Sequence, residues 1–331
     1  MTTGIYGFKE PPFRMTPDVR LFFPSTAHSR AYAHLLYGLS QREGFVVVTG
    51  EVGAGKTTLI ERLCAEFSAK GHAIARVATT QVDATELLRL IAIAFDVPVA
   101  GGKAELLHGI ISTLRSGVAE RGRRQILIVD EAQALPVASL EELRMLSNVT
   151  EGAHALLQVL LLGQPQLRHT LARPDLDQFR QRVLAAYHLP ALTREETHLY
   201  VRHRMTSVGW TGHPVWEESA LDLVHEHSAG IPRRINRLCA RVLLAGSLEH
   251  ATVLTSDLVG MTADELAEDL GAISATVTAG PPATIVEEDV ATVHDLAERL
   301  DQLERAVGRR DRAASRLQKL WAQFATPGGR A

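Results

Sequence analysis

Short runs of apolar residues alternate with longer amphipathic stretches between residues 41 and 192. The apolar runs predict four buried strands, at residues 45–48, 73–80, 126–129 and 155–162. Apolar positions at helical spacing predict helices between them, over residues 57–71, 83–95, 104–120 and 140–146, the second capped by Asp83. Strands that alternate with helices form a parallel sheet covered on both faces, so we predict an α/β fold for residues 41–192.

The pattern changes after residue 192, where the strand-length apolar runs stop. Amphipathic stretches predict a small all-helical domain over residues 193–270, with helices at 193–205, 218–228, 232–248 and 255–270. Residues 1–40 hold aromatic residues and prolines followed by a helical pattern, and we treat them as a separate N-terminal segment. Residues 271–292 are small, polar and contain proline, which is typical of a linker.

Residues 293–326 predict an amphipathic, coiled-coil-like helix, because apolar residues recur there at alternating spacings of four and three. Between Arg305 and Lys319 this helix carries six basic residues and one acidic residue. Three roles stay open for it: a coiled coil with a partner or a second copy, a contact with anionic lipid, or packing against the α/β domain.

Composition places the chain among globular proteins. Apolar residues make up 46% and charged residues 22% of the sequence, and the net charge is −3. This charge argues against a large, uniformly basic surface for nucleic acid. The N-terminus lacks the features of a signal peptide, and no apolar run reaches the ~20 residues of a membrane helix. We therefore expect a cytoplasmic location, peripheral at the inner face of the membrane if the C-terminal helix binds lipid.

Residues 50–57 have the sequence GEVGAGKT, which fits the phosphate-binding pattern G-x-x-x-x-G-K-[ST]. The pattern follows a predicted strand and opens a predicted helix, as this motif requires. Glycines let successive backbone N–H groups point at phosphate oxygens, and the positive end of the helix dipole faces the same anion. Lys56 is expected to reach the phosphates of ATP and the Thr57 hydroxyl to ligate Mg²⁺. The residues expected to bind the cofactor are Gly50, Glu51, Val52, Gly53, Ala54, Gly55, Lys56, Thr57, Thr58 and Asp130.

Two acidic residues, Asp130 and Glu131, follow the predicted strand at 126–129. Acidic residues often follow a buried strand simply because the chain emerges into water there. Here the strand would end at the same edge of the sheet as the phosphate-binding loop, so we expect Asp130 to hold Mg²⁺ and Glu131 to orient or deprotonate the attacking water. Gln164 follows the next predicted strand and supplies an amide that can contact the γ-phosphate and this water.

Two arginine positions complete the predicted site. Arg233 lies in the first turn of a predicted helix, and it can touch the phosphates if the helical domain folds over the nucleotide. In the segment FRQRV, Arg180 or Arg182 can act as an arginine finger on a neighbouring subunit, with Arg182 the preferred candidate. This role requires a homo-oligomer. The alternative for each arginine is an exposed, solvated side chain.

Together the motifs resemble those of AAA+ ATPases: a P-loop (Walker A), Walker B acids, a sensor amide, a finger and GxPR at the start of a lid helix. Between about Tyr6 and Leu258, the phrases GFVVVTGEVGAGKTTL, LIVDEAQALPVASLEELRMLSN and GIPRRIN are similar to ATPases of the ExeA (general secretion pathway protein A) type. The resemblance is strongest to the subgroup associated with exosortase and PEP-CTERM loci. It implies that the N-terminal segment forms one wall of the adenine pocket and that Gln133 supports the site.

The same resemblance implies a setting in secretion, envelope assembly or exopolysaccharide export, with a protein partner from such a system. ExeA-type proteins typically continue into a membrane helix and a peptidoglycan-binding domain, and this sequence contains nothing similar to either. We expect hydrolysis to move the helical domain and change its contacts with a partner, the C-terminal helix being one candidate contact.

Two alternatives to this function stay open. One is a DNA-associated ATPase like the transposition proteins MuB and TniB, with arginines at 121–124 or 233–241 as a basic face. The other is a nucleotide-switched scaffold with little turnover.

Overall fold

The computed structural model describes residues 5–16, 18–78, 81–99, 101–121, 125–152 and 154–278. Residues up to Glu268 belong to one compact unit, and the residues from Asp269 onward belong to a second. Most of the predicted linker and the whole predicted helix at 293–326 lie outside the described residues. No helix within the described residues is both long enough and apolar enough to cross a membrane.

A parallel sheet of five strands forms the centre of the first unit, in the order β2-β3-β6-β1-β7. Its strands are β1 (Phe45–Gly50), β2 (Ala73–Ala78), β3 (Gln125–Asp130), β6 (Leu157–Gly163) and β7 (Val183–Leu189). Every residue of the three central strands is buried, as their continuous apolar runs predict. The edge strand β7 was not predicted, because its buried and exposed positions give no clear period.

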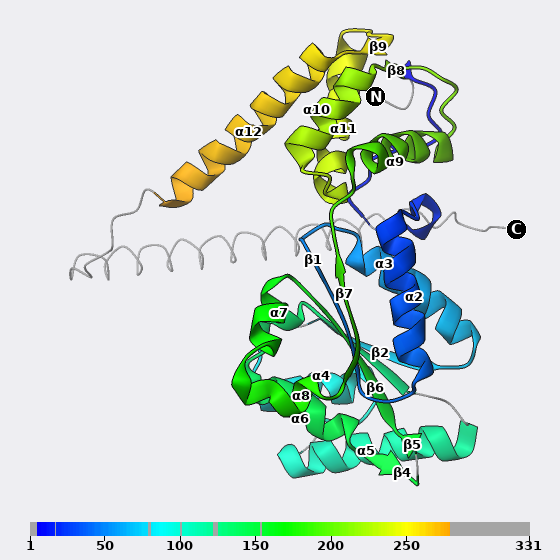
Figure 1. Ribbon diagram of the computed structural model, residues 1–331, viewed down its shortest axis with the longest axis vertical. Coiled ribbons are helices and arrows are strands. Elements are labelled where there is room, and N and C mark those ends of the chain that lie inside the picture. Colours follow the sequence, from blue (N-terminus) through cyan, green and yellow to red (C-terminus); the bar gives the residue numbers. More distant parts are fainter. Residues whose placement is uncertain are drawn as a thin grey trace, which may run out of the picture. The chain divides into compact units, whose positions relative to one another are not determined.

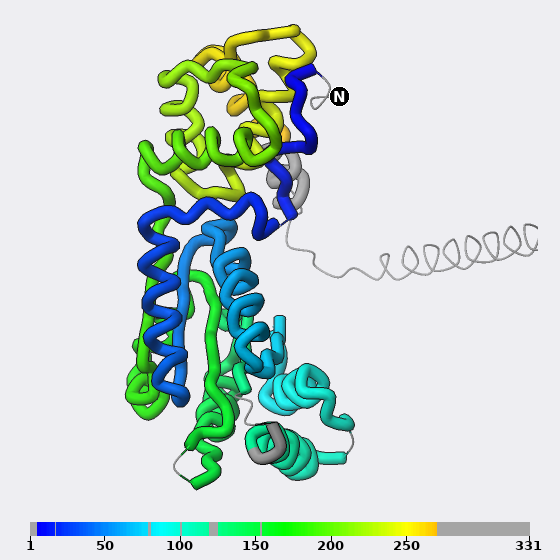
Figure 2. Tube along the Cα trace, turned by 90° about the vertical axis from the view of Figure 1, so that its right-hand side faces the viewer, coloured from blue at the N-terminus to red at the C-terminus, as the bar shows by residue number. Residues whose placement is uncertain are grey.

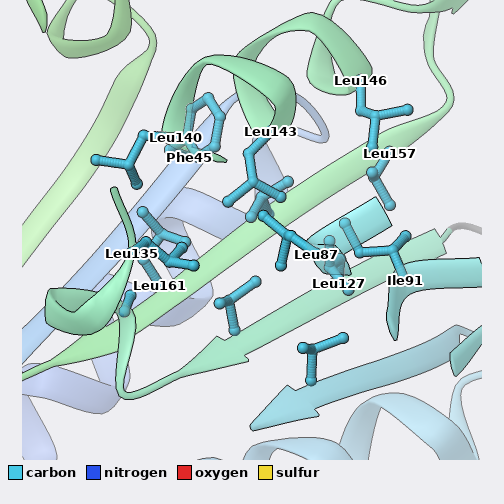
Figure 3. Close-up of a cluster of buried hydrophobic side chains, with 14 of the residues drawn as sticks. Phe45, Leu87, Ile91, Leu127, Leu135, Leu140, Leu143, Leu146, Leu157 and Leu161 are labelled. Carbon is cyan, nitrogen blue, oxygen red and sulfur yellow. The ribbon is translucent and has the colours of Figure 1, made fainter. Parts of the chain in front are cut away.

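Helices cover both faces of the sheet, which confirms the predicted α/β fold (Figure 1). One face packs against α2 (Thr26–Ser40) and α3 (Lys56–Ala69). The other packs against α4 (Ala84–Ala94), α5 (Lys103–Arg121) and α6 (Val137–Ser147), and Figure 3 shows the leucine-rich cluster on that face. The remaining short elements of this region are η1 (Val19–Leu21), η2 (Ala132–Ala134), β4 (Thr150–Glu151), β5 (His154–Ala155), α7 (Gln166–Leu171), η3 (Pro174–Leu176) and α8 (Asp177–Arg180).

Helix α4 begins immediately after Asp83, which confirms the predicted cap. The Asp83 carboxylate accepts hydrogen bonds from the backbone N–H groups of Thr85 and Glu86, each at 2.8 Å. Replacing an N-cap carboxylate by alanine leaves these donors without a protein acceptor, so Asp83→Ala is expected to lower the free energy of unfolding by about 1 kcal/mol. Urea denaturation measures this loss. Asp83→Asn keeps an acceptor and serves as the control, and an equal loss in both variants would contradict the role of the cap.

Four further helices follow the sheet: α9 (Arg194–Ser207), α10 (Glu218–Ser228), α11 (Pro232–Leu248) and α12 (Ser256–Thr278). Two short parallel strands accompany them, β8 (Val215–Trp216) and β9 (Val253–Leu254). They were not predicted, because two residues are too few to show a period. The linker was predicted to begin at residue 271, but helix α12 continues to Thr278. The residues of α12 beyond position 271 include alanines, which favour a helical conformation and do not end a helix.

The N-terminal segment divides between the two parts of the first unit. Tyr6, Phe8 and Phe13 belong to the same hydrophobic cluster as helices α9, α10 and α11, whereas α2 packs on the sheet (Figure 2). Buried Arg204 of α9 binds residues 12–14 of the N-terminal segment. Its guanidinium donates hydrogen bonds to the carbonyl oxygens of Pro12 at 2.7 Å and Arg14 at 3.3 Å. Residues 5–16 are therefore structurally part of the helical domain.

Candidate functional site

The loop after β1 has the backbone conformation of a phosphate-binding loop. Gly53 and Gly55 have φ of 84° and 97°, in the left-handed region that favours glycine, and helix α3 starts at Lys56. The Lys56 ammonium, largely buried, donates to the carbonyl oxygens of Gly50 at 2.7 Å and Glu51 at 3.0 Å. Burial lowers the pKa of Lys56, and the nearby carboxylates of Glu131 and Asp130 oppose that shift.

A cavity of about 260 Å³ opens beside this loop. Its walls come from four places: the phosphate-binding loop and the start of α3, the N-terminal segment, the end of β3, and the helical domain. Its lining residues include Arg14, Phe22, Phe23, His28, Gly53, Gly55, Lys56, Thr57, Thr58, Glu131, Tyr200, Arg204, Arg233 and Asn236. The cavity therefore extends from the loop to a wall built by the N-terminal segment and α9.

Glu131 lies at the edge of the cavity and is held by two amide side chains. Its carboxylate accepts hydrogen bonds from Gln133 Nε2 at 2.6 Å and Gln164 Nε2 at 3.1 Å, and Gln133 Oε1 accepts from the Gln164 backbone at 2.9 Å. The hydrogen bond from Gln133, followed by those from Gln164 and the charge of Lys56, lowers the pKa of Glu131 although burial opposes it. The carboxylate is therefore ionised at neutral pH. The backbone φ angle of Glu131 is 53°, which is rare for a residue with a side chain. Strained backbone conformations of this kind are concentrated at functional sites.

Asp130 ends strand β3 and does not line the cavity. Its carboxylate accepts from the Arg76 guanidinium at 2.7 Å and from the Glu131 N–H at 3.0 Å. Thr57, in the first turn of α3, lines the cavity and carries a hydroxyl. A carboxylate and a hydroxyl are oxygen ligands of the kind that Mg²⁺ prefers, so the side chains present fit this cation.

The helical domain touches the phosphate-binding loop directly. The Arg233 backbone N–H, at the start of α11, donates to the carbonyl oxygen of Gly53 at 3.2 Å. A Cβ at position 53 would lie 2.3 Å from Cβ of Arg233, so this close approach requires glycine. Arg233 lines the cavity, and its guanidinium makes no hydrogen bond or ion pair with another described residue. It is therefore free to bind an anion there.

The two arginines of the segment FRQRV differ in their surroundings. Arg180 donates to the carbonyl oxygens of Leu171 at 3.2 Å and Arg173 at 2.9 Å, and it pairs with Asp177. The Arg182 side chain has no such partner in the described part of the chain. Strand β7 begins directly after Arg182 and pairs with the start of β1, at the opposite end from the phosphate-binding loop. Arg182 is therefore distant from the loop of its own chain.

Comparison with known proteins agrees with this geometry. Residues 39–171 match the AAA domain family. General secretion pathway protein A of Aeromonas hydrophila is 39% identical over 248 residues, which cover 74% of this chain and 45% of that protein. This chain is a AAA+ protein. It is related to general secretion pathway protein A, and it spans less than half the length of that relative.

Solved structures with the same AAA+ fold are more distant in sequence. The ORC2 protein of Aeropyrum pernix, in ADPNP and ADP complexes, matches with a TM-score of 0.55 and 20% identity over 72% of this chain and 66% of that chain. The ORC1 protein of the same organism, in complex with DNA, matches with a TM-score of 0.57 and 16% identity over 78% of this chain and 69% of that chain. At this identity, the likeness shows the fold alone.

The AAA+ site contains residues that the sequence motifs did not indicate. Arg76 lies on strand β2 and becomes a partner of Asp130 only when β2 pairs beside β3. Asn236 accepts a hydrogen bond from the Tyr200 hydroxyl at 2.8 Å, and both residues line the far wall of the cavity. His28 also lines it, although its helix precedes the phosphate-binding loop in sequence. No local pattern marks these residues, because their roles depend on tertiary packing.

Proposed function

We propose that this chain binds Mg-ATP in the cavity beside residues 50–57 and hydrolyses it. The supporting observation is that one cavity gathers the cation of Lys56, the carboxylate of Glu131 and the unpaired guanidinium of Arg233. Two of these groups complement the negative charge of the phosphates. The third is an ionised carboxylate, which is the group needed to accept a proton from water.

In this proposal the backbone N–H groups of the loop and Lys56 bind the phosphates. Thr57 and Asp130 would hold Mg²⁺, which neutralises charge on the phosphate oxygens. Glu131 takes the proton of the attacking water, and Gln164, hydrogen-bonded to Glu131 at 3.1 Å, orients that water. The wall formed by Arg14, Phe22 and Phe23 of the N-terminal segment and by α9 receives the nucleoside.

Hydrolysis changes the position of the helical domain in this proposal. Arg233 contacts the loop through its backbone and also lines the cavity, so its guanidinium would bind the γ-phosphate. Loss of the γ-phosphate removes a ligand of that guanidinium and favours opening. The relative in Aeromonas hydrophila supports the proposal of a role in secretion. From the resemblance of the sequence motifs, we extend this proposal to envelope assembly and exosortase-linked exopolysaccharide export, on the cytoplasmic side of the membrane. We propose a homo-oligomer and a protein partner, with residues 293–326 as one candidate contact.

Lys56→Ala tests nucleotide binding. Loss of the ammonium removes a charge-assisted contact with the phosphates, and we expect the affinity for a fluorescent ATP analogue to fall about 10- to 100-fold. Lys70→Ala is the control, since Lys70 lies at the other end of α3 and pairs with the exposed Glu66. Equal affinities for wild type and Lys56→Ala would refute this site.

The steady-state rate of ATP hydrolysis distinguishes the proposed ATPase from the alternative of a nucleotide-switched scaffold. A wild type that binds ATP but hydrolyses it no faster than Glu131→Gln would be a nucleotide-switched scaffold.

One structural feature supports the alternative of a DNA-associated ATPase. Arg234, Arg237 and Arg241 are exposed along α11, whereas the side chains at 121–124 lie outside the described residues. Duplex DNA binding that weakens steeply with added salt would support this alternative, because phosphate neutralisation releases counterions. A complete lack of binding at low salt would exclude it.

A further inference from the structure

Arg204 of α9 carries a charge in a buried place. It is 5% exposed, and it forms no ion pair with any residue that the structure describes. Buried arginines normally face a carboxylate, because an uncompensated charge is costly to remove from water. The chemistry of ATP hydrolysis proposed above gives this guanidinium no task, although Arg204 lines the cavity.

Three neighbours fix the orientation of the guanidinium. Nε donates to the Pro12 carbonyl at 2.7 Å, and Nη2 donates to the Arg14 carbonyl at 3.3 Å. Cζ lies over the Tyr200 ring, 5.9 Å from its centroid, at a distance where a cation and an aromatic face attract each other. Tyr200 is itself held, since its hydroxyl donates to Asn236 Oδ1 at 2.8 Å. The guanidinium is therefore held in place without a nucleotide.

The same geometry leaves one terminal nitrogen unused. In the planar guanidinium Nε and Nη2 share one edge, so the N–H groups of Nη1 point away from the carbonyls of Pro12 and Arg14. Nη1 makes no hydrogen bond with a described residue. It still reaches solvent, because Asn148 Oδ1 is the one fully buried side-chain atom without a hydrogen bond in the described part of the chain. Since Arg204 lines the cavity, Nη1 is a donor for whatever fills it.

Helix α11 indicates which end of the cavity this donor faces. Arg233, at the start of α11, binds Gly53 of the phosphate-binding loop through its backbone. Asn236 lies three residues further on, about 4.5 Å along the helix axis, and its Nδ2 contacts the Arg14 carbonyl at 3.4 Å. Arg204 binds that same carbonyl. The guanidinium therefore lies beyond Arg233 as seen from the loop, at the wall that receives the nucleoside in the proposed function.

We propose that Arg204 contacts the base of the bound nucleotide, with Nη1 donating a hydrogen bond to a ring nitrogen. The inference rests on the proposed ATP binding, and it adds a residue outside the phosphate-binding motif that recognises the base. The ring nitrogens of a purine are acceptors, which suit a side chain that has only donors. The contact also joins the base to the N-terminal segment, because the same guanidinium binds the carbonyls of Pro12 and Arg14.

Three ATP analogues test the contact. In each of them C–H replaces one ring nitrogen of the base, N1, N3 or N7, and competition with a fluorescent ATP analogue measures each affinity. Wild type is expected to bind one of the three about tenfold more weakly than ATP, the loss for one charge-assisted hydrogen bond. Arg204→Met removes the donors, so it should bind ATP at least about tenfold more weakly than wild type does. It should bind that same analogue as tightly as it binds ATP.

The ratio of two affinities within one variant does not depend on the fraction of protein that is folded, so loosening of the structure alone leaves it unchanged. Arg202→Met is the control, because Arg202 lies on the same helix, pairs with Glu218 and is not among the residues that line the cavity. It should keep the wild-type ratio.

Each contrary result has a distinct meaning. If wild type binds ATP and all three analogues equally, no ring nitrogen is contacted, and the proposal is refuted while ATP binding stands. This comparison needs no variant, so it holds even where Arg204→Met does not fold. If the analogue still binds tenfold more weakly than ATP in Arg204→Met, another donor makes the contact, and the proposal is again refuted. If wild type binds no ATP, the proposed function fails and the inference fails with it.

Discussion

Arg182→Ala is expected to lower ATP turnover by the assembled protein about 10³-fold, with no change in ATP affinity. Arg182 lies near the start of β7, away from the phosphate-binding loop of its own chain, and its guanidinium has no partner in the described part of the chain. An arginine placed in this way can stabilise transition-state charge only in a neighbouring subunit. Neighbouring Arg180 is bound to carbonyl groups of its own segment, which leaves Arg182 as the candidate.

Mixing two inactive variants provides a sharp measurement of this effect. Arg182→Ala retains Glu131, and Glu131→Gln retains Arg182, so a mixed assembly contains some sites with both groups. Activity that appears only on mixing would establish a finger acting between subunits. Arg173→Ala is the control, because Arg173 pairs with Asp175 in the same region and should keep full turnover. Turnover per subunit that is independent of protein concentration and unaffected in Arg182→Ala would contradict the assignment.

Glu131→Gln is expected to reduce single-turnover hydrolysis about 10²- to 10⁴-fold, which is the range for loss of a general base. The ionised carboxylate is replaced by a neutral amide of similar size, so ATP should still bind. Rapid mixing of excess enzyme with ATP measures the chemical step, and a fluorescent analogue measures the affinity. Glu86→Gln on the surface of α4 serves as the control. If hydrolysis is unchanged in Glu131→Gln, another group activates the water.

The features that could be predicted from sequence are those with a local physical cause. The loop at 50–57 combines positive-φ glycines, a lysine and a helix start within eight residues, so the motif can be recognised without reference to the rest of the chain. The central strands were equally clear, because burial on both faces gives continuous apolar runs. Asp83 was recognisable because a cap acts on the next three residues.

The features that could not be predicted depend on packing between distant segments. Arg76 meets Asp130 only through the order of strands in the sheet, and His28 meets the loop only because α2 packs beside α3. The resemblance implies that the N-terminal segment forms one wall of the adenine pocket, and this stays a prediction. The structure shows that Arg14, Phe22 and Phe23 of the segment line the cavity. The division of the segment between two hydrophobic clusters was not predicted, because its aromatic residues show no period that would assign them to either cluster.

That division has a mechanical consequence. The chain passes between the two clusters first at Phe22 and Phe23, adjacent residues that pack on different clusters, and again between Leu189 and Leu192. A domain connected to its neighbour at one point can rotate in every direction, whereas a domain connected at two points rotates only about the line that joins them. The helical domain is therefore expected to open and close along a single arc. One contact at the rim, such as that between Arg233 and Gly53, is then sufficient to stop the whole movement.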